Sequence, residues 1–156
     1  MDEWATWLGA SYLGPGQIAL RLGAAIAFAC LIGLDRELKR KPLGLRTNML
    51  VALGAASFCV LVIELLHLPD PGPNAGKVDA GRVLEGIIGG IGFLGAGAII
   101  QERDRVIGAT TGAGIWTVGA IGIACGFGYY LHAAAITLLA LFVLTVLGLV
   151  EGHKDE

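Results

Sequence analysis

The sixteen residues from Glu85 to Ile100, EGIIGGIGFLGAGAII, constrain the fold more than any other segment. Six of them are glycine, and nearly all of the others are apolar. In water this segment would form a poor helix, because each interior glycine costs about 0.8–1.0 kcal/mol relative to alanine. In a bilayer an unsatisfied backbone amide costs several kcal/mol, so an apolar segment has to be helical. We therefore predict a transmembrane helix whose glycines serve close packing.

With about 100° of rotation per residue, these glycines divide into two grooves of small side chains. The first groove consists of Gly86, Gly90 and Gly97. The second consists of Gly89, Gly92, Gly95 and Ala96. Small residues let helix backbones approach closely in membranes, so the pattern predicts a central helix packed on two sides. The stripe predicted to face lipid consists of Ile87, Ile91, Leu94 and Ala98. The simpler alternative is a glycine-rich span with no function beyond packing.

The composition supports an integral membrane protein. The 156 residues are 55% hydrophobic and only 15% charged, and the mean hydropathy is +0.73. Such values with long apolar runs are typical of membrane proteins. The net charge of −2, without interleaved aromatic and basic residues, excludes a basic nucleic-acid binder.

We predict an all-α protein with five transmembrane helices in a single domain. The approximate spans are 18–34, 47–66, 84–100, 110–127 and 131–150. A short interfacial helix is expected over residues 2–14, where Trp4, Trp7, Leu8 and Tyr12 recur at helical spacing. No soluble domain is expected after the fifth span.

The fourth and fifth spans differ in composition. The fourth repeats the glycine pattern, with one face formed by Gly112, Gly119, Gly122 and Gly126. Trp116 lies beside this face at mid-depth, where we expect it to fill a gap inside the bundle. The fifth span carries large aliphatic residues on all sides, which is typical of a peripheral, lipid-exposed helix. The three cysteines lack CxxC spacing and are expected to be buried small hydrophobes: Cys30, Cys59 and Cys125.

The distribution of basic residues predicts the orientation. The loop over residues 35–46 holds five of the eleven Lys and Arg residues. If this loop is cytoplasmic, the inside holds eight basic residues and the outside three, as the positive-inside rule requires. Five spans then place the N-terminus outside and the C-terminus in the cytoplasm of a bacterial inner (plasma) membrane.

Polar residues gather in two layers. The cytoplasmic layer contains Asp35, Arg36, Glu37, Arg46, Thr47, Asn48, Gln101, Glu102, Thr110 and Thr111. The outer layer contains Arg21, Glu64, Arg82 and Glu85. No ionisable residue lies at the midplane, which argues against a proton relay or a buried transport site. We place the functional site in the cytoplasmic layer, around residues 35–48. The alternative is a structural clasp between two helix ends.

Enzymatic motifs are missing from the sequence. There is no P-loop, nucleophile elbow or HExxH helix, so we expect neither an enzyme nor a bound cofactor. Weak candidates for a metal ligand are Glu64 and Glu85.

Three ordered segments carry a family resemblance. They are GLDRELKRKPLGLRTNMLVALGA from Gly33, RVLEGIIGGIGFLGAGAII from Arg82, and GATTGAGIWTVGAIGIACGFGYY from Gly108. Together they resemble the signatures of the MgtC/SapB family of bacterial inner-membrane proteins, which are tied to magnesium limitation, intramacrophage survival and acid stress. The resemblance implies a non-enzymatic regulator of another membrane complex, with the F-type ATP synthase as partner.

This sequence departs from the family pattern in three places. Asp35 stands where glutamate is usual, and Glu85 stands where an uncharged residue is usual. Many relatives also continue into a soluble cytoplasmic domain, whereas this sequence ends at Glu156.

Two other function classes remain open. One is a small transporter or channel for Mg²⁺ or another cation, with hard oxygen ligands drawn from Asp35, Glu37, Glu64 and Glu85. The other is a passive scaffold, which fits the glycine grooves but does not explain the cytoplasmic cluster. A second copy of the chain is a further candidate partner beside the lipid bilayer.

Overall fold

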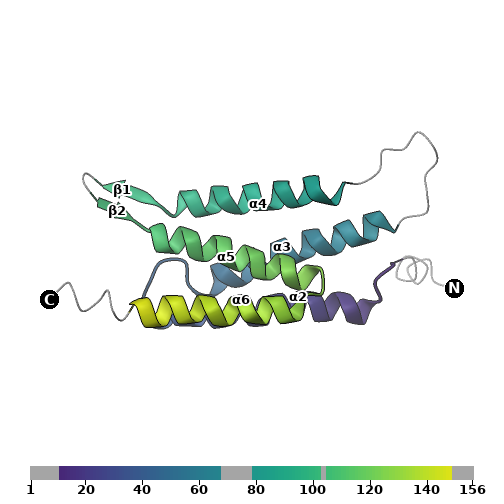
Figure 1. Ribbon diagram of the computed structural model, residues 1–156, viewed down its shortest axis with the longest axis horizontal. Coiled ribbons are helices and arrows are strands. Elements are labelled where there is room, and N and C mark those ends of the chain that lie inside the picture. Colours follow the sequence, from purple (N-terminus) through teal and green to yellow (C-terminus); the bar gives the residue numbers. More distant parts are fainter. Residues whose placement is uncertain (1–10, 68–78, 103–104, 149–156) are drawn as a thin grey trace.

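The computed structural model describes residues 11–67, 79–102 and 105–148, and these are mostly helical. The helices are α2 (Pro15–Leu38), α3 (Leu45–Leu66), α4 (Ala80–Gly97), α5 (Ala109–Gly126) and α6 (Tyr130–Phe142), which continues into a π-helical turn, Val143–Leu147. They run side by side along the long axis of the molecule (Figure 1). Each predicted span overlaps one of these five helices. The predicted helix over residues 2–14 falls mainly on residues 1–10, outside the described part of the chain.

Three of the helices are long and apolar enough to cross a membrane, namely α2, α3 and α5. The α6 helix is apolar but shorter, and α4 carries Arg82 and Glu85 in its first two turns. The structure therefore supports a helical membrane protein with three clear spans. Of the five predicted crossings, those of α2, α3 and α5 are thus supported by length and composition.

The turns between the last three helices depend on two glycines with positive φ. Between α4 and α5, strand β1 (Ile100–Glu102) pairs antiparallel with β2 (Arg105–Ile107), and Ile100 lies opposite Ile107. Gly108 follows the hairpin with φ 89°, and Gly128 follows α5 with φ 84°. Both conformations favour glycine, because it lacks a Cβ atom.

The central helix is α5, which packs against all four other helices. At Gly122 an added Cβ would lie 2.9 Å from both Ala52 Cα and Ala55 Cβ of α3. At Gly126 it would lie 2.6 Å from Cys59 Cβ. Two other glycines of α5, Gly112 and Gly119, face α4. Glycine therefore lets two helices approach α5 closely.

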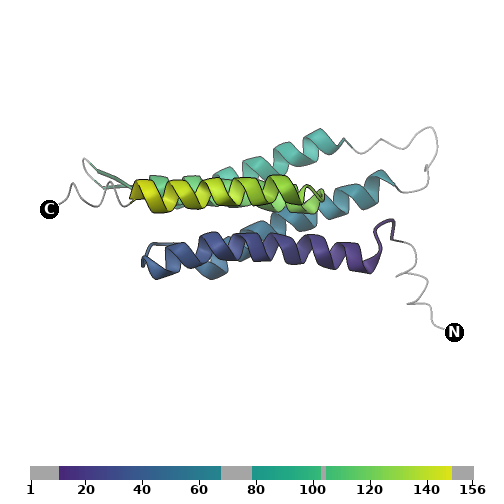
Figure 2. The same ribbon diagram turned by 60° about the horizontal axis from the view of Figure 1, so that its bottom comes forward.

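The prediction that the segment around Glu85–Ile100 forms the central helix is wrong. α4 lies at the edge of the bundle in both views (Figure 1, Figure 2) and packs mainly on α5. Ile91, expected to face lipid, is buried at 8% exposure because it fills the space beside Gly119. Leu94 is exposed as predicted. Gly95 contacts Gly112 backbone to backbone.

The prediction for Trp116 is also wrong, since its side chain is 53% exposed. Small residues of α5 already let α3 and α4 approach that helix closely, and Trp116 lies instead at the edge of a surface groove beside α4. Cys59 and Cys125 are buried and Cys30 is half-buried, and all three are free thiols. This agrees with their predicted role as small hydrophobes.

Candidate functional site

The predicted cytoplasmic cluster lies where α2 and α3 meet. Their backbones touch at this end of the bundle, because a Cβ at Gly33 would lie 2.8 Å from Leu45 Cα. The connecting loop, residues 39–44, is therefore short and tight. Arg40 and Leu43 in this loop have positive φ values of 52° and 56°, which are uncommon for residues other than glycine. Such a loop needs partners for its backbone groups.

Arg36 supplies the first of these partners. Its side chain is buried, at 5% exposure. Its Nε and one terminal nitrogen donate to the Pro42 carbonyl at 3.3 and 3.2 Å, and the same nitrogen donates to Thr111 Oγ1 at 2.5 Å. Arg36 therefore joins α2, the loop and α5.

Glu37 and Asn48 hold the other side of the loop. The Glu37 carboxylate accepts a hydrogen bond from the Leu45 amide at 3.2 Å, at the start of α3. Asn48, 1% exposed, donates from Nδ2 to the carbonyls of Leu43 and Gly44 at 2.7 and 2.8 Å. The Leu45 amide is one of the groups that the start of a helix leaves free, and the Asn48 bonds tie the end of the loop to the first turn of α3. We call Arg36, Glu37, Asn48 and Thr111 the loop clasp.

Asp35 belongs to a different contact. It pairs with Lys39 Nζ at 2.6 Å and accepts a hydrogen bond from Thr145 Oγ1 at 3.2 Å. Lys39 also donates to the Leu144 carbonyl at 3.2 Å, within the π-helical turn after α6. Asp35 therefore ties the end of α2 to α6, whereas the neighbouring Arg36 ties it to α5.

The remaining predicted residues do not join the loop clasp. Arg46 is exposed, and among the described residues the single ion pair is Lys39–Asp35. Thr47 lines a groove between α3 and α4, and Thr110 lines another beside α6. The predicted single cluster is thus divided into a loop clasp, an α6 contact and separate surface residues.

At the opposite end of the bundle, Glu64 and Arg21 have similar structural roles. Glu64 accepts hydrogen bonds from the Ser11 hydroxyl at 2.8 Å and from the amides of Tyr12 and Leu13 at 2.7 and 2.9 Å. Arg21 donates to the Gly126 carbonyl at 2.6 Å, at the end of α5. Each charged group anchors a chain segment that enters or leaves a helix.

The geometry offers little for a metal ion. Glu85 is exposed on α4, and the oxygens of Glu64 already accept three hydrogen bonds. Within residues 11–67, 79–102 and 105–148, no group of three His, Cys, Asp or Glu residues is placed to hold a metal. In this part of the chain the two weak candidates do not form a site.

A second candidate site is the side of α4 that points away from α5. Because Ile91 and Gly95 face α5, the residues about half a turn away face outward. An added Cβ would meet nothing within 4 Å at Gly86, Gly89, Gly90, Gly92 or Gly97. Phe93, which lies on the same side of α4 as these glycines, is 80% exposed. We call Gly86, Gly89, Gly90, Phe93 and Gly97 the outward face of α4. The five predicted packing glycines of α4 other than Gly95 therefore have no close neighbour in the described chain.

Several residues at these sites were missing from the prediction. Lys39 is one turn after Asp35, so the i, i+4 spacing of opposite charges indicated this pair. The contact of Asp35 with Thr145 lies 110 residues away in the sequence, and no local signal indicates it. The burial of Ile91 was also missed, because its partner Gly119 lies on another helix.

Most of this chain aligns with known proteins. Residues 22–153 match the MgtC family. Protein SapB of Bacillus subtilis is 41% identical over 133 residues, which cover 83% of this chain and 56% of that protein. Protein MgtC of Salmonella typhimurium is 40% identical over 122 residues, covering 78% of this chain and 48% of that protein. Protein MgtC of Brucella abortus is 40% identical over 126 residues, covering 81% and 49%. No solved structure matches the chain.

The aligned region establishes the family relationship, but it does not cover the full length of those relatives. This chain spans about half the length of the curated relatives that it matches. The family match covers α2 from residue 22 onward, the other four helices, the loop clasp and the outward face of α4. On these grounds the chain belongs to the MgtC family.

Proposed function

We propose that this chain is a non-enzymatic regulator in the bacterial inner membrane, linked to magnesium homeostasis and to stress or virulence adaptation. It binds another membrane complex through the outward face of α4. The family resemblance makes the F-type ATP synthase the leading candidate for that complex. All five helices cross the membrane, with the N-terminus outside and the C-terminus in the cytoplasm.

The observation that supports this proposal most is the unoccupied small-residue face of α4. Glycine offers little contact area to lipid, and each interior glycine weakens a helix by about 0.8–1.0 kcal/mol relative to alanine. In membranes, small residues on a helix face instead allow a second helix to pack closely. Within the described chain nothing lies within 4 Å of a Cβ added at these glycines, and Gly86 and Gly90 border an open groove between α4 and α3. We therefore expect a helix of another protein to occupy this face.

The cation-transport alternative receives less support. The charged residues of the described helices lie near the two ends of the bundle, and the helix segments between them carry none. Transport pathways are usually marked by ionisable residues inside the membrane. Glu64, one of the two weak metal candidates, already accepts hydrogen bonds from residues 11–13.

A photocrosslinking experiment tests the partner face. Phe93 is replaced by a benzophenone amino acid in cells, with Leu138 on α6 as the matched control, because Leu138 is 67% exposed on a different helix. We expect the Phe93 probe, and not the Leu138 probe, to yield a crosslinked membrane protein identifiable by mass spectrometry. Equal labelling from both positions, or crosslinks to lipid alone, would contradict the proposed face. A crosslink from Phe93 to a second copy of this chain would show that the outward face binds another copy and not a regulatory partner.

Cysteine labelling tests the orientation separately. In a background in which the native cysteines are alanine, one variant carries Asn74→Cys and the other carries Lys41→Cys in the exposed loop of the clasp. An impermeant maleimide added to spheroplasts should label the first variant and not the second, because the basic loop is cytoplasmic. Lysis should then make position 41 reactive, which serves as the accessibility control. The reverse pattern in intact spheroplasts would overturn the orientation.

A further inference from the structure

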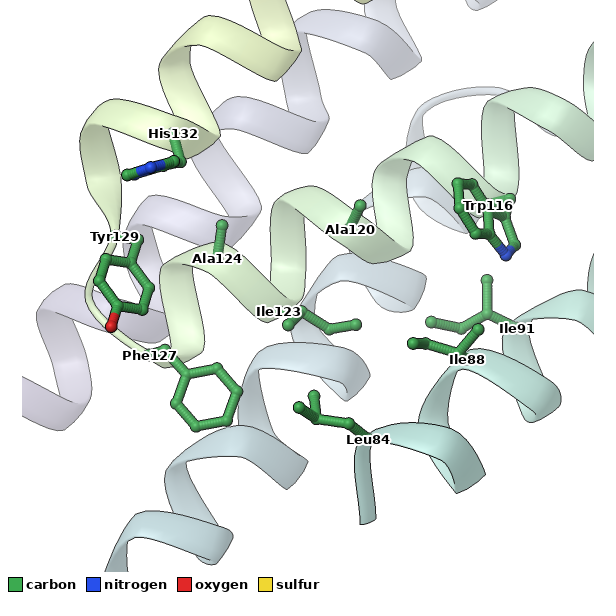
Figure 3. A pocket seen from close by; sticks show the side chains of 10 residues that line it. All are labelled: Leu84, Ile88, Ile91, Trp116, Ala120, Ile123, Ala124, Phe127, Tyr129 and His132. Atoms are coloured by element: carbon green, nitrogen blue, oxygen red, sulfur yellow. The ribbon is translucent and has the colours of Figure 1, made fainter. Parts of the chain in front are cut away.

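A groove of about 420 Å³ runs along α5 between α4 and the start of α6. Ala120 and Ala124 form its floor, and Ile88 of α4 lies on one wall (Figure 3). Trp116 lies at one end of the groove, and Tyr129 and His132 lie at the other (Figure 3). The small side chains of the floor leave a channel that larger residues would fill. This groove is on the side of α4 that faces α5, away from its outward face.

The length of the groove matches the thickness of one leaflet of a bilayer. Trp116 and Phe127 are eleven residues apart, which corresponds to about 16 Å along a helix. The hydrocarbon core is roughly 30 Å thick, so one leaflet contributes roughly 15 Å. Phe127 lies at the end of the bundle that carries Arg21 and Glu64, and Trp116 therefore lies near the midplane. A transmembrane helix would need a groove of about twice this length.

Apart from the indole N–H of Trp116 at the far end, the polar side-chain groups of the groove lie at its mouth. The walls are aliphatic or aromatic, whereas Tyr129 and His132 are exposed at the mouth with their rings 5.5 Å apart in an edge-on arrangement. Behind them, the Arg21 guanidinium lies against the same turn, since a Cβ at Gly128 would be 3.3 Å from its terminal nitrogen. Helix α6 begins here, and its N-cap, Tyr129, provides no side-chain hydrogen bond to the first turn. Hydrogen-bond donors therefore lie at one end of an apolar channel, with a positive charge behind the adjacent turn.

We propose that this groove binds one acyl chain of a glycerophospholipid, with the phosphate at the mouth beside Tyr129 and His132. The apolar channel accounts for the chain, and its length accounts for a single leaflet. The donors and the charge of Arg21 complement the anionic phosphate. Trp116, exposed at mid-depth, forms the closed end against which the chain terminates. The inference is independent of the proposed regulatory function.

Depth-resolved photolabelling of the full chain in lipid nanodiscs tests this proposal. The probes are phosphatidylglycerols with a diazirine either at the acyl terminus or near the ester. The terminal probe should label peptides containing Trp116 and Ile88, and the ester-proximal probe should label Phe127 to His132. Labelling should exceed that of the exposed α6 residue Leu138 roughly tenfold, a preference of about 1.4 kcal/mol. A diazirine diacylglycerol, which lacks the phosphate, should label the groove less.

A filled groove provides the matched comparison. Ala120→Phe places a ring on the floor, and Ala135→Phe adds the same ring to an exposed position of α6 outside the groove. The first variant should lose most groove labelling, and the second should label like the unmodified protein. If Ala120→Phe does not fold, competition of the probe by unlabelled phosphatidylglycerol in the unmodified protein decides the matter. Uniform labelling of all exposed apolar residues would overturn the proposal, as would occupation of the groove by a second copy or another protein.

Discussion

Replacing Gly122 by leucine is expected to abolish the folded bundle. A Cβ at this position would already lie 2.9 Å from Ala52 Cα and 2.9 Å from Ala55 Cβ. The first of these is backbone, so α3 and α5 would have to separate along their contact. Overpacking of a close interface costs typically 1–3 kcal/mol and more when backbone must move, so we expect a loss above about 3 kcal/mol. Thermal unfolding and gel filtration in mild detergent measure this effect.

Gly90→Leu is the matched control for that substitution. The same side chain is added to a glycine of the neighbouring α4 helix, where an added Cβ meets nothing within 4 Å. We expect its melting temperature to match that of the unmodified protein, while crosslinking from the outward face to the partner is lost. The close packing predicted for Gly90 from the sequence would instead require Gly90→Leu to disrupt folding. Equal destabilisation by the two variants would restore that earlier prediction and contradict the packing described here.

Replacing Arg36 by methionine should give the second large effect. Methionine preserves much of the side-chain bulk but removes the donors to Pro42 and Thr111. Hydrogen bonds from charged groups contribute about 1.5–3 kcal/mol each, so we expect a destabilisation of roughly 2–4 kcal/mol. Arg36→Lys should also destabilise, because a single ammonium does not reproduce the planar fork that reaches both acceptors. The midpoint of unfolding in detergent provides the measurement.

Arg46→Met separates the loop clasp from a general effect of basic charge. Arg46 lies ten residues later and is exposed, so its removal should change stability by less than about 0.5 kcal/mol. A larger loss at Arg46 than at Arg36 would contradict the assignment of the clasp. Growth under magnesium limitation adds a functional readout. If Arg36→Met unfolds at the same midpoint as the unmodified protein but fails to support growth, the cluster is a ligand or partner site rather than a clasp.

The helices and the layers of charge were predictable because a membrane imposes strong constraints. An apolar segment must be helical and about twenty residues long, so hydropathy located all five helices. Charged residues avoid the hydrocarbon, so the two polar ends were also predicted. The predicted residues Arg36, Glu37, Asn48 and Thr111 do meet at one of those ends. Local sequence chemistry was sufficient for these features.

The arrangement of the helices was less predictable, because it depends on contacts between distant segments. Both α4 and α5 carry glycine faces, and nothing local indicates which of them is central. The answer depends on pairs such as Ile91 with Gly119, in which a large side chain fills the space over a glycine. Arg36 and Arg46 similarly flank one loop, and only the first is buried. The positive φ values of Arg40 and Leu43 shape that loop, and neither residue type indicates such a conformation.

The edge position of α4 has a thermodynamic consequence. One side of this helix forms a wall of the proposed lipid groove, and the opposite side is the proposed partner face. Any displacement of α4 therefore changes the geometry of both sites. By linkage, if a bound lipid changes the affinity for the partner by some factor, the partner changes the affinity for the lipid by the same factor. The composition of the surrounding membrane would then act as an effector of the regulator, and α4 would be the element that transmits its influence.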